Sequence, residues 1–269
     1  MYFYWLQINQ YVNILTMNTE KIFKDILMML SDIYQNEGSK NGSLTAEALS
    51  LAGNQTFNLK ENENDELSKL FNSFISNDDH LLAHQLKEIS NFLPWHHSNM
   101  GGRIEGDLKK QFIQFVLLGP SGIIISNDYE VGIFMQMANI DYPVRRHPAE
   151  ETFFIISGKG YFNKDSNPEI YGDVGDYVPN PSKVYHSDRK EEHHMIWSWG
   201  WSGGLRGAVV ENLKISKFFN FCPEKASKIQ FFYYFPRKCV ENTIFPGAFS
   251  QTCHLTHLPG YTDNLQKFK

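Results

Sequence analysis

Hydrophobic residues recur at helical spacing in the first third of the chain and at strand-like spacing after it. Apolar positions three and four apart, behind a good N-cap at Asn18, predict a helix over residues 19–34. A second helical pattern covers residues 67–89, and the turn-forming run SNDD divides it. Residues 36–66, rich in Gly, Ser and charge, are expected to form a loose connection. These patterns predict a helical subdomain over residues 18–93.

Short β-rich runs separated by Gly, Pro, Asn and Asp follow this subdomain. The runs are QFIQFVLLG, GIIIS, VGIFMQMANI, TFFIIS, KGYF and MIWSWGW. Short strands at steady spacing with such turns are typical of an antiparallel sandwich or barrel. We expect a mainly β unit over residues 94–210. Residues 1–17, an apolar extension, and residues 211–269, a tail interrupted by prolines, stay unassigned.

Composition narrows the classes of partner. With 269 residues and 42% hydrophobic content the chain can bury one good core, and 14% aromatic residues allow an aromatic-lined pocket. A net charge of −5 argues against a nucleic-acid surface. The apolar start is too short to span a membrane and lacks the features of a signal peptide. We therefore expect a small-molecule partner, with no nucleic acid and no membrane; a homodimer is compatible with this.

The cysteines indicate the compartment. Cys222, Cys239 and Cys253 form an odd set near the end of the chain, without a CxxC pair. Such a set offers no disulfide framework. The expected environment is therefore reducing, and the expected location is the cytoplasm.

The stretch YPVRRHPAEETFFIISGKG, residues 142–160, places His147 and Glu151 four residues apart ahead of an apolar strand. Alternation along this strand points Glu151, Phe153 and Ile155 to one face. A carboxylate that faces such an interior needs a partner, because an unpaired buried charge is costly. A metal ion is one partner, since zinc, iron, manganese and nickel all accept imidazole and carboxylate ligands. A buried ion pair with the neighbouring arginines, 145–146, is the other.

A second motif, GDVGDYVPNPSKVYH, brings Gly175, Pro181 and His186 at a fixed spacing. Together the two stretches resemble the two cupin motifs, which implies a cupin fold: a double-stranded β-helix, or jelly-roll barrel, here with an N-terminal helical subdomain. Three residues depart from the pattern. They are Arg145 in place of the first histidine, Lys183 in place of a glycine, and Lys190 in place of a closing polar residue.

The cupin resemblance implies one divalent metal ion held by three protein ligands. These would be His147, Glu151 and His186, with open positions left for water or substrate. Zinc or iron is expected first, with manganese or nickel as further candidates.

A narrower resemblance concerns the run Tyr-Pro-x-x-x-His-Pro-Ala-Glu-Glu that starts at Tyr142 and is followed by a β-run and Ser-Gly. It looks like the bacterial cupin-type dimethylsulfoniopropionate (DMSP) lyases. A Leu-Pro-Trp segment at residues 93–95 and the run WSWGW add support, and the similarity spans roughly residues 65–205. The resemblance implies a metal-dependent carbon–sulfur lyase that eliminates dimethyl sulfide from DMSP and leaves acrylate.

The resemblance also implies roles for aromatic residues. The alternating Trp197, Trp199 and Trp201 would offer aromatic faces to the sulfonium by cation–π attraction, or would simply fill the core. Phe153 stands where these lyases have their tyrosine base, and it has no proton to exchange. Tyr142, which matches another pocket tyrosine of the family, would have to act as the base instead.

Arg145 leaves several interpretations open. Its planar fork could clamp a substrate carboxylate through two hydrogen bonds, neutralise a glutamate at the barrel rim, or displace the metal. Alternative functions are another metal-dependent cupin enzyme that acts on a small carboxylate, as an isomerase or a dioxygenase, and a non-catalytic cupin that binds a small ligand.

Other histidines receive weaker predictions. The adjacent pairs at residues 96–97 and 193–194 are expected in surface loops, because neighbouring side chains diverge on a strand. Cys253, His254 and His257 have the composition of a ligand set but fall in the unassigned tail.

Overall fold

The computed structural model divides into two units, Met1–Glu224 and Lys225–Lys269, and the described residues all belong to the first. The described residues are 2–57, 59–62, 66–98, 106–165, 167–190, 192–203, 205 and 211–212, with side chains described between residues 18 and 205. The tail from residue 213 onward, with Cys253, His254 and His257, lies outside them.

Helices come first in the described chain. They are α1 (Tyr2–Glu37), α2 (Lys40–Ala52), α3 (Glu66–Phe74) and α4 (Leu81–Glu88), followed by the 3₁₀ turn η1 (Ser90–Phe92). α1 contains the helix predicted over residues 19–34 but begins at Tyr2 rather than at the predicted cap. α3 and α4 confirm the second predicted pattern, whereas α2 occupies a segment predicted to be loose. In the part of the chain that was described, no helix combines the length and apolarity needed to cross a membrane.

The strands form two sheets. They are β1 (His96–His97), β2 (Phe112–Gly119), β3 (Ile124–Ile125), β4 (Tyr129–Gln136), β5 (Asp141–Arg146), β6 (Glu150–Gly158), β7 (Gly160–Lys164), β8 (Ile170–Gly172), β9 (Tyr177–Asn180), β10 (His186–Arg189), β11 (Met195–Ser202) and β12 (Glu211–Asn212), with the 3₁₀ turn η2 (Gly106–Gln111) ahead of β2. One sheet has the order β1-β2-β4-β11-β6-β9, with β3 beside β2, and the other β12-β5-β10-β7-β8. Among the described strands, every pairing is antiparallel except that of β2 with β3.

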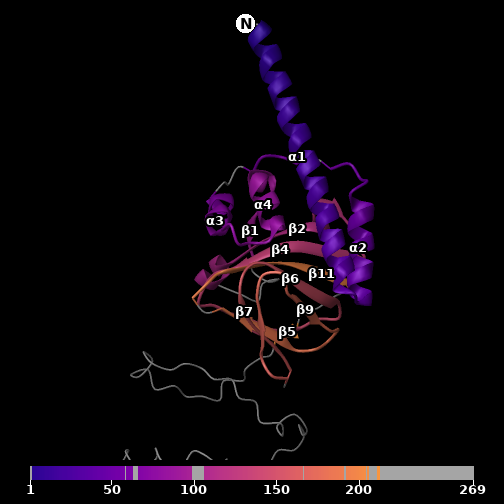
Figure 1. Ribbon diagram of the computed structural model, residues 1–269, viewed down its shortest axis with the longest axis vertical. Coiled ribbons are helices and arrows are strands. Elements are labelled where there is room, and N and C mark those ends of the chain that lie inside the picture. Colours follow the sequence, from indigo (N-terminus) through magenta and orange to yellow (C-terminus); the bar gives the residue numbers. More distant parts are fainter. Residues whose placement is uncertain are drawn as a thin grey trace, which may run out of the picture. The chain divides into compact units, whose positions relative to one another are not determined.

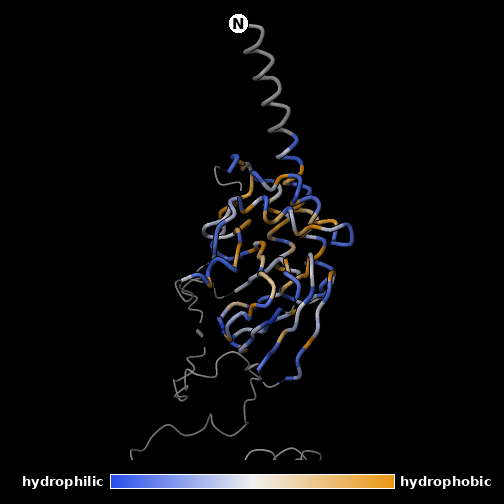
Figure 2. Tube along the Cα trace, turned by 90° about the vertical axis from the view of Figure 1, so that its left-hand side faces the viewer, coloured by the Kyte–Doolittle hydropathy of each residue, from blue (hydrophilic) through white to orange (hydrophobic). Residues whose placement is uncertain are grey.

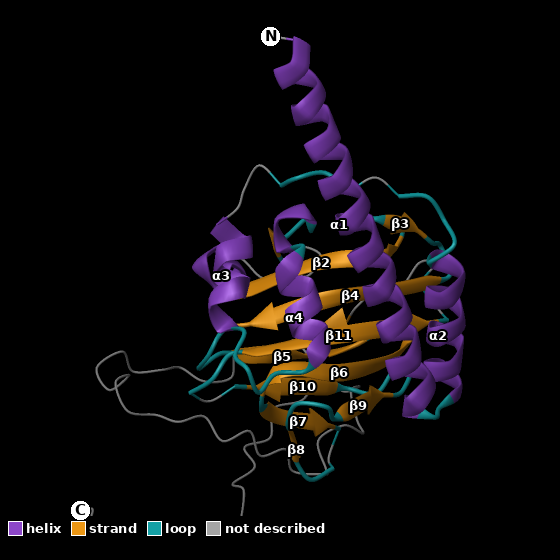
Figure 3. Cartoon of the chain, turned by 45° about the horizontal axis from the view of Figure 1, so that its top comes forward, coloured by secondary structure: helices purple, strands orange, loops and turns teal. Residues whose placement is uncertain are grey.

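Figures 1 and 3 show the helices gathered on one face of the larger sheet, while the smaller sheet lies on its other side. Two hydrophobic clusters follow from this layering. The first joins the helices to the outer face of the larger sheet, and the second fills the space between the sheets. Figure 2 shows the hydrophobic stretches of the chain mostly inside the described body and hydrophilic stretches around it.

Strand β6 contributes to both clusters, because successive side chains of a strand point to opposite faces. Phe154 and Ile156 pack against the helical layer. Phe153 and Ile155 face the interior between the sheets, on the same side as Glu151. The predicted orientation of Glu151 toward an apolar interior therefore agrees with the fold.

Tyr34 of α1 ties the helical layer to the larger sheet. Its side chain is fully buried, its hydroxyl lies 3.0 Å from Ser198 Oγ of β11, and it is 3.4 Å from the Thr152 carbonyl oxygen of β6. Burial raises the pKa of Tyr34, so the hydroxyl stays protonated.

We expect Tyr34→Ala to lower the free energy of unfolding by about 3–5 kcal/mol, because a fully buried aromatic ring is lost. Tyr34→Phe should cost only about 1 kcal/mol, since it removes the hydrogen bonds and keeps the ring. Urea unfolding followed by circular dichroism measures both values. Equal losses in the two variants would contradict the assignment of most of the stabilisation to packing.

Candidate metal centre

The two histidines and the glutamate predicted as ligands lie together between the two sheets. Glu151 is the second residue of β6 in the larger sheet, and His186 begins β10 in the smaller one. His147 directly follows β5, and strand pairing sets His186 opposite Arg145. One candidate ligand atom from each of the three side chains lies within 4.8 Å of the others, and all three residues are buried.

Hydrogen bonds fix both imidazoles so that one nitrogen of each is aimed at Glu151. His147 Nδ1 lies 3.0 Å from the Ala149 carbonyl oxygen, and His186 Nδ1 lies 3.0 Å from that of Val184. A ring nitrogen that faces a carbonyl must carry the proton, which leaves a lone pair on each Nε2. These Nε2 atoms lie 3.4 Å and 3.3 Å from Glu151 Oε2.

This donor set fits a divalent metal ion. Both Nε2 atoms are buried, and neither has a hydrogen-bond partner among the described residues. Two imidazole lone pairs and a carboxylate oxygen would repel one another unless a cation lies between them. Two nitrogens and one oxygen suit zinc or iron and leave coordination positions open.

In the alternative interpretation, an arginine would pair with Glu151, but both candidate arginines contact other residues. Arg145 Nη2 lies 3.5 Å from Asp188 Oδ2, and both side chains are buried. The Arg146 guanidinium lies 4.6 Å from the centre of the Tyr185 ring. Asp188, which sequence reasoning missed, is the carboxylate that pairs with Arg145.

Glu151 is held by donors from two other strands. Asn180 Nδ2 of β9 donates to Oε2 at 3.0 Å, and Trp201 Nε1 of β11 donates to Oε1. Burial acts to raise the pKa of Glu151, but in the metal-free protein the positive charge and N–H groups that His147 and His186 offer when protonated outweigh it and hold that pKa well below its usual range. Partners of this kind orient a metal-ligating carboxylate. The contact of Asn180 with Glu151 was also not predicted, because only the position of Asn180 opposite Glu151 on the neighbouring strand indicates it.

The metal-free protein should lose stability as the pH falls. Burial, with Arg145 nearby, lowers the pKa of His186, and the pKa of Glu151 is also held low. The unfolded chain therefore takes up these protons first, near pH 6.5 for histidine and pH 4.3 for glutamate, to give approximate values. We expect the free energy of unfolding, measured in urea with a chelator present, to decrease steadily between about pH 7 and pH 4. A flat profile over that range would contradict the assignment.

Arg145 lies next to the candidate metal centre, because strand pairing sets it opposite His186. Its guanidinium carbon stands 3.6 Å from the centre of the Tyr142 ring and 5.9 Å from that of Phe153. Its Nη1 is buried and has no hydrogen-bond partner among the described residues. A buried donor of this kind costs stability unless something accepts from it, and a ligand carboxylate is an acceptor of the right shape.

The tryptophan strand β11 runs alongside β6 and faces the same interior. Trp201 pairs with Glu151, and Trp199 pairs with Phe153. Trp197 lies deeper, with its ring centre 5.5 Å from that of Phe153. The three rings therefore line the interior next to the metal centre, and Trp201 alone among them bonds to a ligand residue.

Lys183 shows why a glycine is usual at its position. Its φ is +63°, in the left-handed region that glycine adopts without strain. Its backbone N–H donates to the His147 carbonyl oxygen at 2.8 Å. The turn thereby ties the second motif to the first despite the departure from the pattern.

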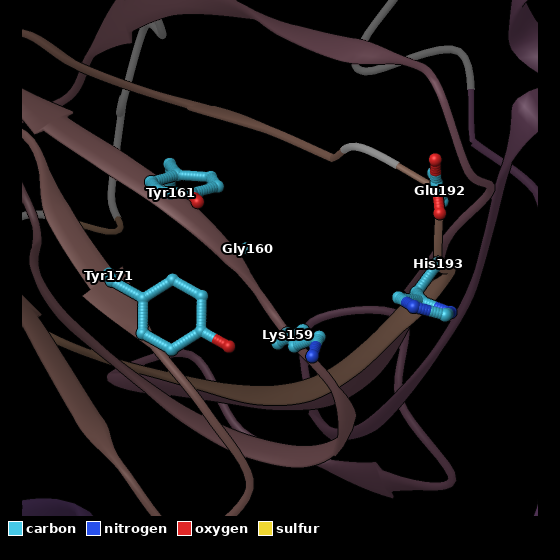
Figure 4. Close-up of a pocket in the computed structure, with 6 residues that line it drawn as sticks. All are labelled: Lys159, Gly160, Tyr161, Tyr171, Glu192 and His193. Carbon is cyan, nitrogen blue, oxygen red and sulfur yellow. The ribbon is translucent and has the colours of Figure 1, made fainter.

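Other candidate residues lie apart from this centre. His96 and His97 are exposed on β1, and His194 packs against Phe74. A surface hollow of about 260 Å³ contains none of the ligand residues (Figure 4). Its lining residues are Lys159, Gly160, Tyr161, Tyr171, Glu192 and His193.

Comparison with known proteins was made by sequence and by structure. A model of the dimethylsulfoniopropionate lyase family matches residues 52–196. The dimethylsulfoniopropionate lyase DddQ of Ruegeria pomeroyi is 29% identical over 116 residues, which cover 43% of this chain and 58% of that protein. The chain thus spans less than two thirds of this relative's length.

Two solved structures resemble the fold. The DMSP lyase DddQ from Ruegeria pomeroyi DSS-3 gives a TM-score of 0.50 at 22% identity, over 67% of this chain and 95% of that one. A structure from a report on the DMSP lyases RdDddP and RnDddQII gives a TM-score of 0.53 at 16% identity, over 71% of this chain and 98% of that one. The predicted cupin-like fold with N-terminal helices is therefore confirmed.

Proposed function

Because the chain belongs to the dimethylsulfoniopropionate lyase family, we propose that it is a metal-dependent carbon–sulfur lyase acting on a small carboxylate, with DMSP as the first candidate substrate. The observation that carries the proposal is the buried cluster of His147, Glu151 and His186, with two Nε2 atoms lacking partners. A divalent ion held there would act as a Lewis acid on the substrate carboxylate and so acidify the adjacent carbon.

The chain's own residues would bind the substrate and take the proton. Arg145 Nη1 is available to donate a hydrogen bond to one carboxylate oxygen of the substrate. Tyr142, whose ring the Arg145 guanidinium covers, would act as the phenolate and take the proton from the α-carbon, which returns it to the neutral phenol. The electron pair of that C–H bond forms the double bond of acrylate, and the pair of the broken C–S bond leaves with dimethyl sulfide.

The test measures headspace dimethyl sulfide from purified protein and DMSP, with each divalent metal added to chelator-treated protein. We expect slow, metal-dependent release that is lost in His147→Ala, because that variant removes a ligand. Exposed His96 supplies the matched control, and His96→Ala should keep the wild-type rate. Release that is absent with every metal would refute DMSP cleavage.

A second candidate function keeps the metal and changes the reaction. The unpartnered Arg145 Nη1 and the apolar Phe153 favour a site that anchors a carboxylate without a base at that position. An isomerase or a dioxygenase acting on a small carboxylate fits these features. Oxygen consumption by iron-loaded protein would identify the dioxygenase.

A further inference from the structure

Lys190 is a buried cation inside the barrel that the proposed reaction does not use. Its side chain is fully enclosed, and Nζ donates to Asp188 Oδ1 at 2.9 Å. The same Nζ stands 4.9 Å from the centre of the Phe162 ring and 5.1 Å from that of Trp197. A cation within about 6 Å of an aromatic face is attracted by the ring quadrupole. Lys190 therefore occupies aromatic faces that another cation could use.

Arg145 also occupies aromatic faces, nearer the candidate metal centre. Its guanidinium lies over the Tyr142 ring and beside the Phe153 ring. The Phe153 ring in turn lies 5.5 Å from Trp197 and 6.2 Å from Phe162, centre to centre. The rings that carry the two protein cations thus surround the position where the resemblance places the family's base. A substrate that reacts there would place its leaving group among them.

The surroundings of Lys190 provide a carboxylate partner and enough space for its side chain. Asp188 is shared between Arg145 and Lys190, so two cations face one carboxylate. Gly160 makes room for the lysine, because a Cβ at that position would lie only 2.9 Å from Lys190 Cδ and Nζ. The Lys190 side chain therefore occupies space that a side chain at position 160 would need.

We infer that Arg145 and Lys190 weaken the binding of substrates with a cationic leaving group, so that DMSP is cleaved only slowly, and that they favour a small carboxylate whose far end is uncharged. The inference rests on the proposed function and names its substrate class. A sulfonium would meet two fixed positive charges and aromatic faces already occupied. A thiolate, which departs with the electron pair of the broken C–S bond, would instead be neutralised by the Lys190 ammonium.

Two ligands of the same shape, of which only one carries a positive charge, distinguish the effect of charge on binding from the effect of size. DMSP and 4-methylpentanoate share a carboxylate and a branched end, but a C–H group replaces the sulfonium in the second. Binding of each to metal-loaded protein is measured by titration calorimetry. We expect wild-type protein to bind 4-methylpentanoate at least about tenfold more tightly than DMSP, a factor within the range of one desolvated cation–π contact.

Lys190→Met keeps the length of the side chain and removes its charge, and Asp188 retains Arg145 as its partner. This variant should bind DMSP about tenfold more tightly than wild type does, while its affinity for 4-methylpentanoate changes less than about threefold. Lys159→Met makes the same change at an exposed lysine, and it should leave both affinities as in wild type.

The outcomes separate this inference from the proposed function. Equal affinities of wild type for the two ligands would overturn the inference and leave the lyase proposal standing, and that comparison needs no variant to fold. An unchanged affinity ratio in folded Lys190→Met would overturn it as well. If neither ligand binds in a metal-dependent way, the proposed function fails and the inference falls with it.

Discussion

Replacing Glu151 by glutamine is expected to lower metal affinity by about a thousandfold, more than the tenfold to hundredfold typical of lost outer partners. The glutamate supplies the anionic oxygen on which both Nε2 atoms converge. Glutamine keeps the shape but loses the charge, and its amide N–H₂ would face one of the donors, Asn180 or Trp201, that now bond to the carboxylate. Competition with a chromogenic chelator measures the affinity.

The neighbouring Glu150 provides a matched control, because it lies on the same strand and is exposed. Glu150→Gln should bind metal as wild type does. Metal at a hundred times its dissociation constant should also stabilise wild type and Glu150→Gln by about 2.7 kcal/mol. Equal metal-induced stabilisation of Glu151→Gln would show that the metal binds elsewhere.

The apolar strands of the barrel could be predicted because one period governs them. Alternation along β6 assigned Glu151 and Phe153 to the interior, and the interior cluster contains Phe153 together with the inward tryptophans of β11. Strand β10 was not predicted, because all four residues of its run HSDR are polar. Its inward side chains are polar, because His186 faces Glu151 and Asp188 pairs with Arg145 and Lys190, and hydropathy does not record such contacts.

Helix α2 was missed because Gly and Ser were interpreted as breakers. Ser39 is its N-cap and accepts a hydrogen bond from the Gly42 N–H. Gly42 lies against the end of α1, and a Cβ there would be 2.5 Å from the Tyr34 carbonyl oxygen. The residues that look like a linker therefore allow two helices to approach closely, and only the tertiary contact reveals it.

The two buried cations, Arg145 and Lys190, show another limit of prediction from sequence. Both residues depart from the cupin motifs, and the sequence allows several interpretations of Arg145. The structure adds Asp188, whose carboxylate lies within reach of both side chains. No spacing rule links residues 145, 188 and 190; strand pairing across the smaller sheet brings them together.

Replacing Phe153 by tyrosine is expected to raise the rate of dimethyl sulfide release from DMSP by about a hundredfold, since a positioned general base contributes roughly 10²–10⁴. Phe153 is 2% exposed and faces the interior beside Arg145. A hydroxyl added to this ring would lie on the interior face of β6, the face that also carries Glu151. Headspace gas chromatography with metal-loaded protein gives the rate.

Two further variants establish whether position 153 acts as the base. Phe154 is the next residue, on the opposite face of β6, so Phe154→Tyr adds the same hydroxyl away from the metal centre and should not raise the rate. In the Phe153→Tyr background, Tyr142→Phe should cost little, because the new tyrosine takes the proton. In otherwise wild-type protein the same change should abolish release. A rate that stays at the wild-type level in folded, metal-loaded Phe153→Tyr would place the reacting carbon away from this ring and would argue for the carboxylate-anchoring alternative.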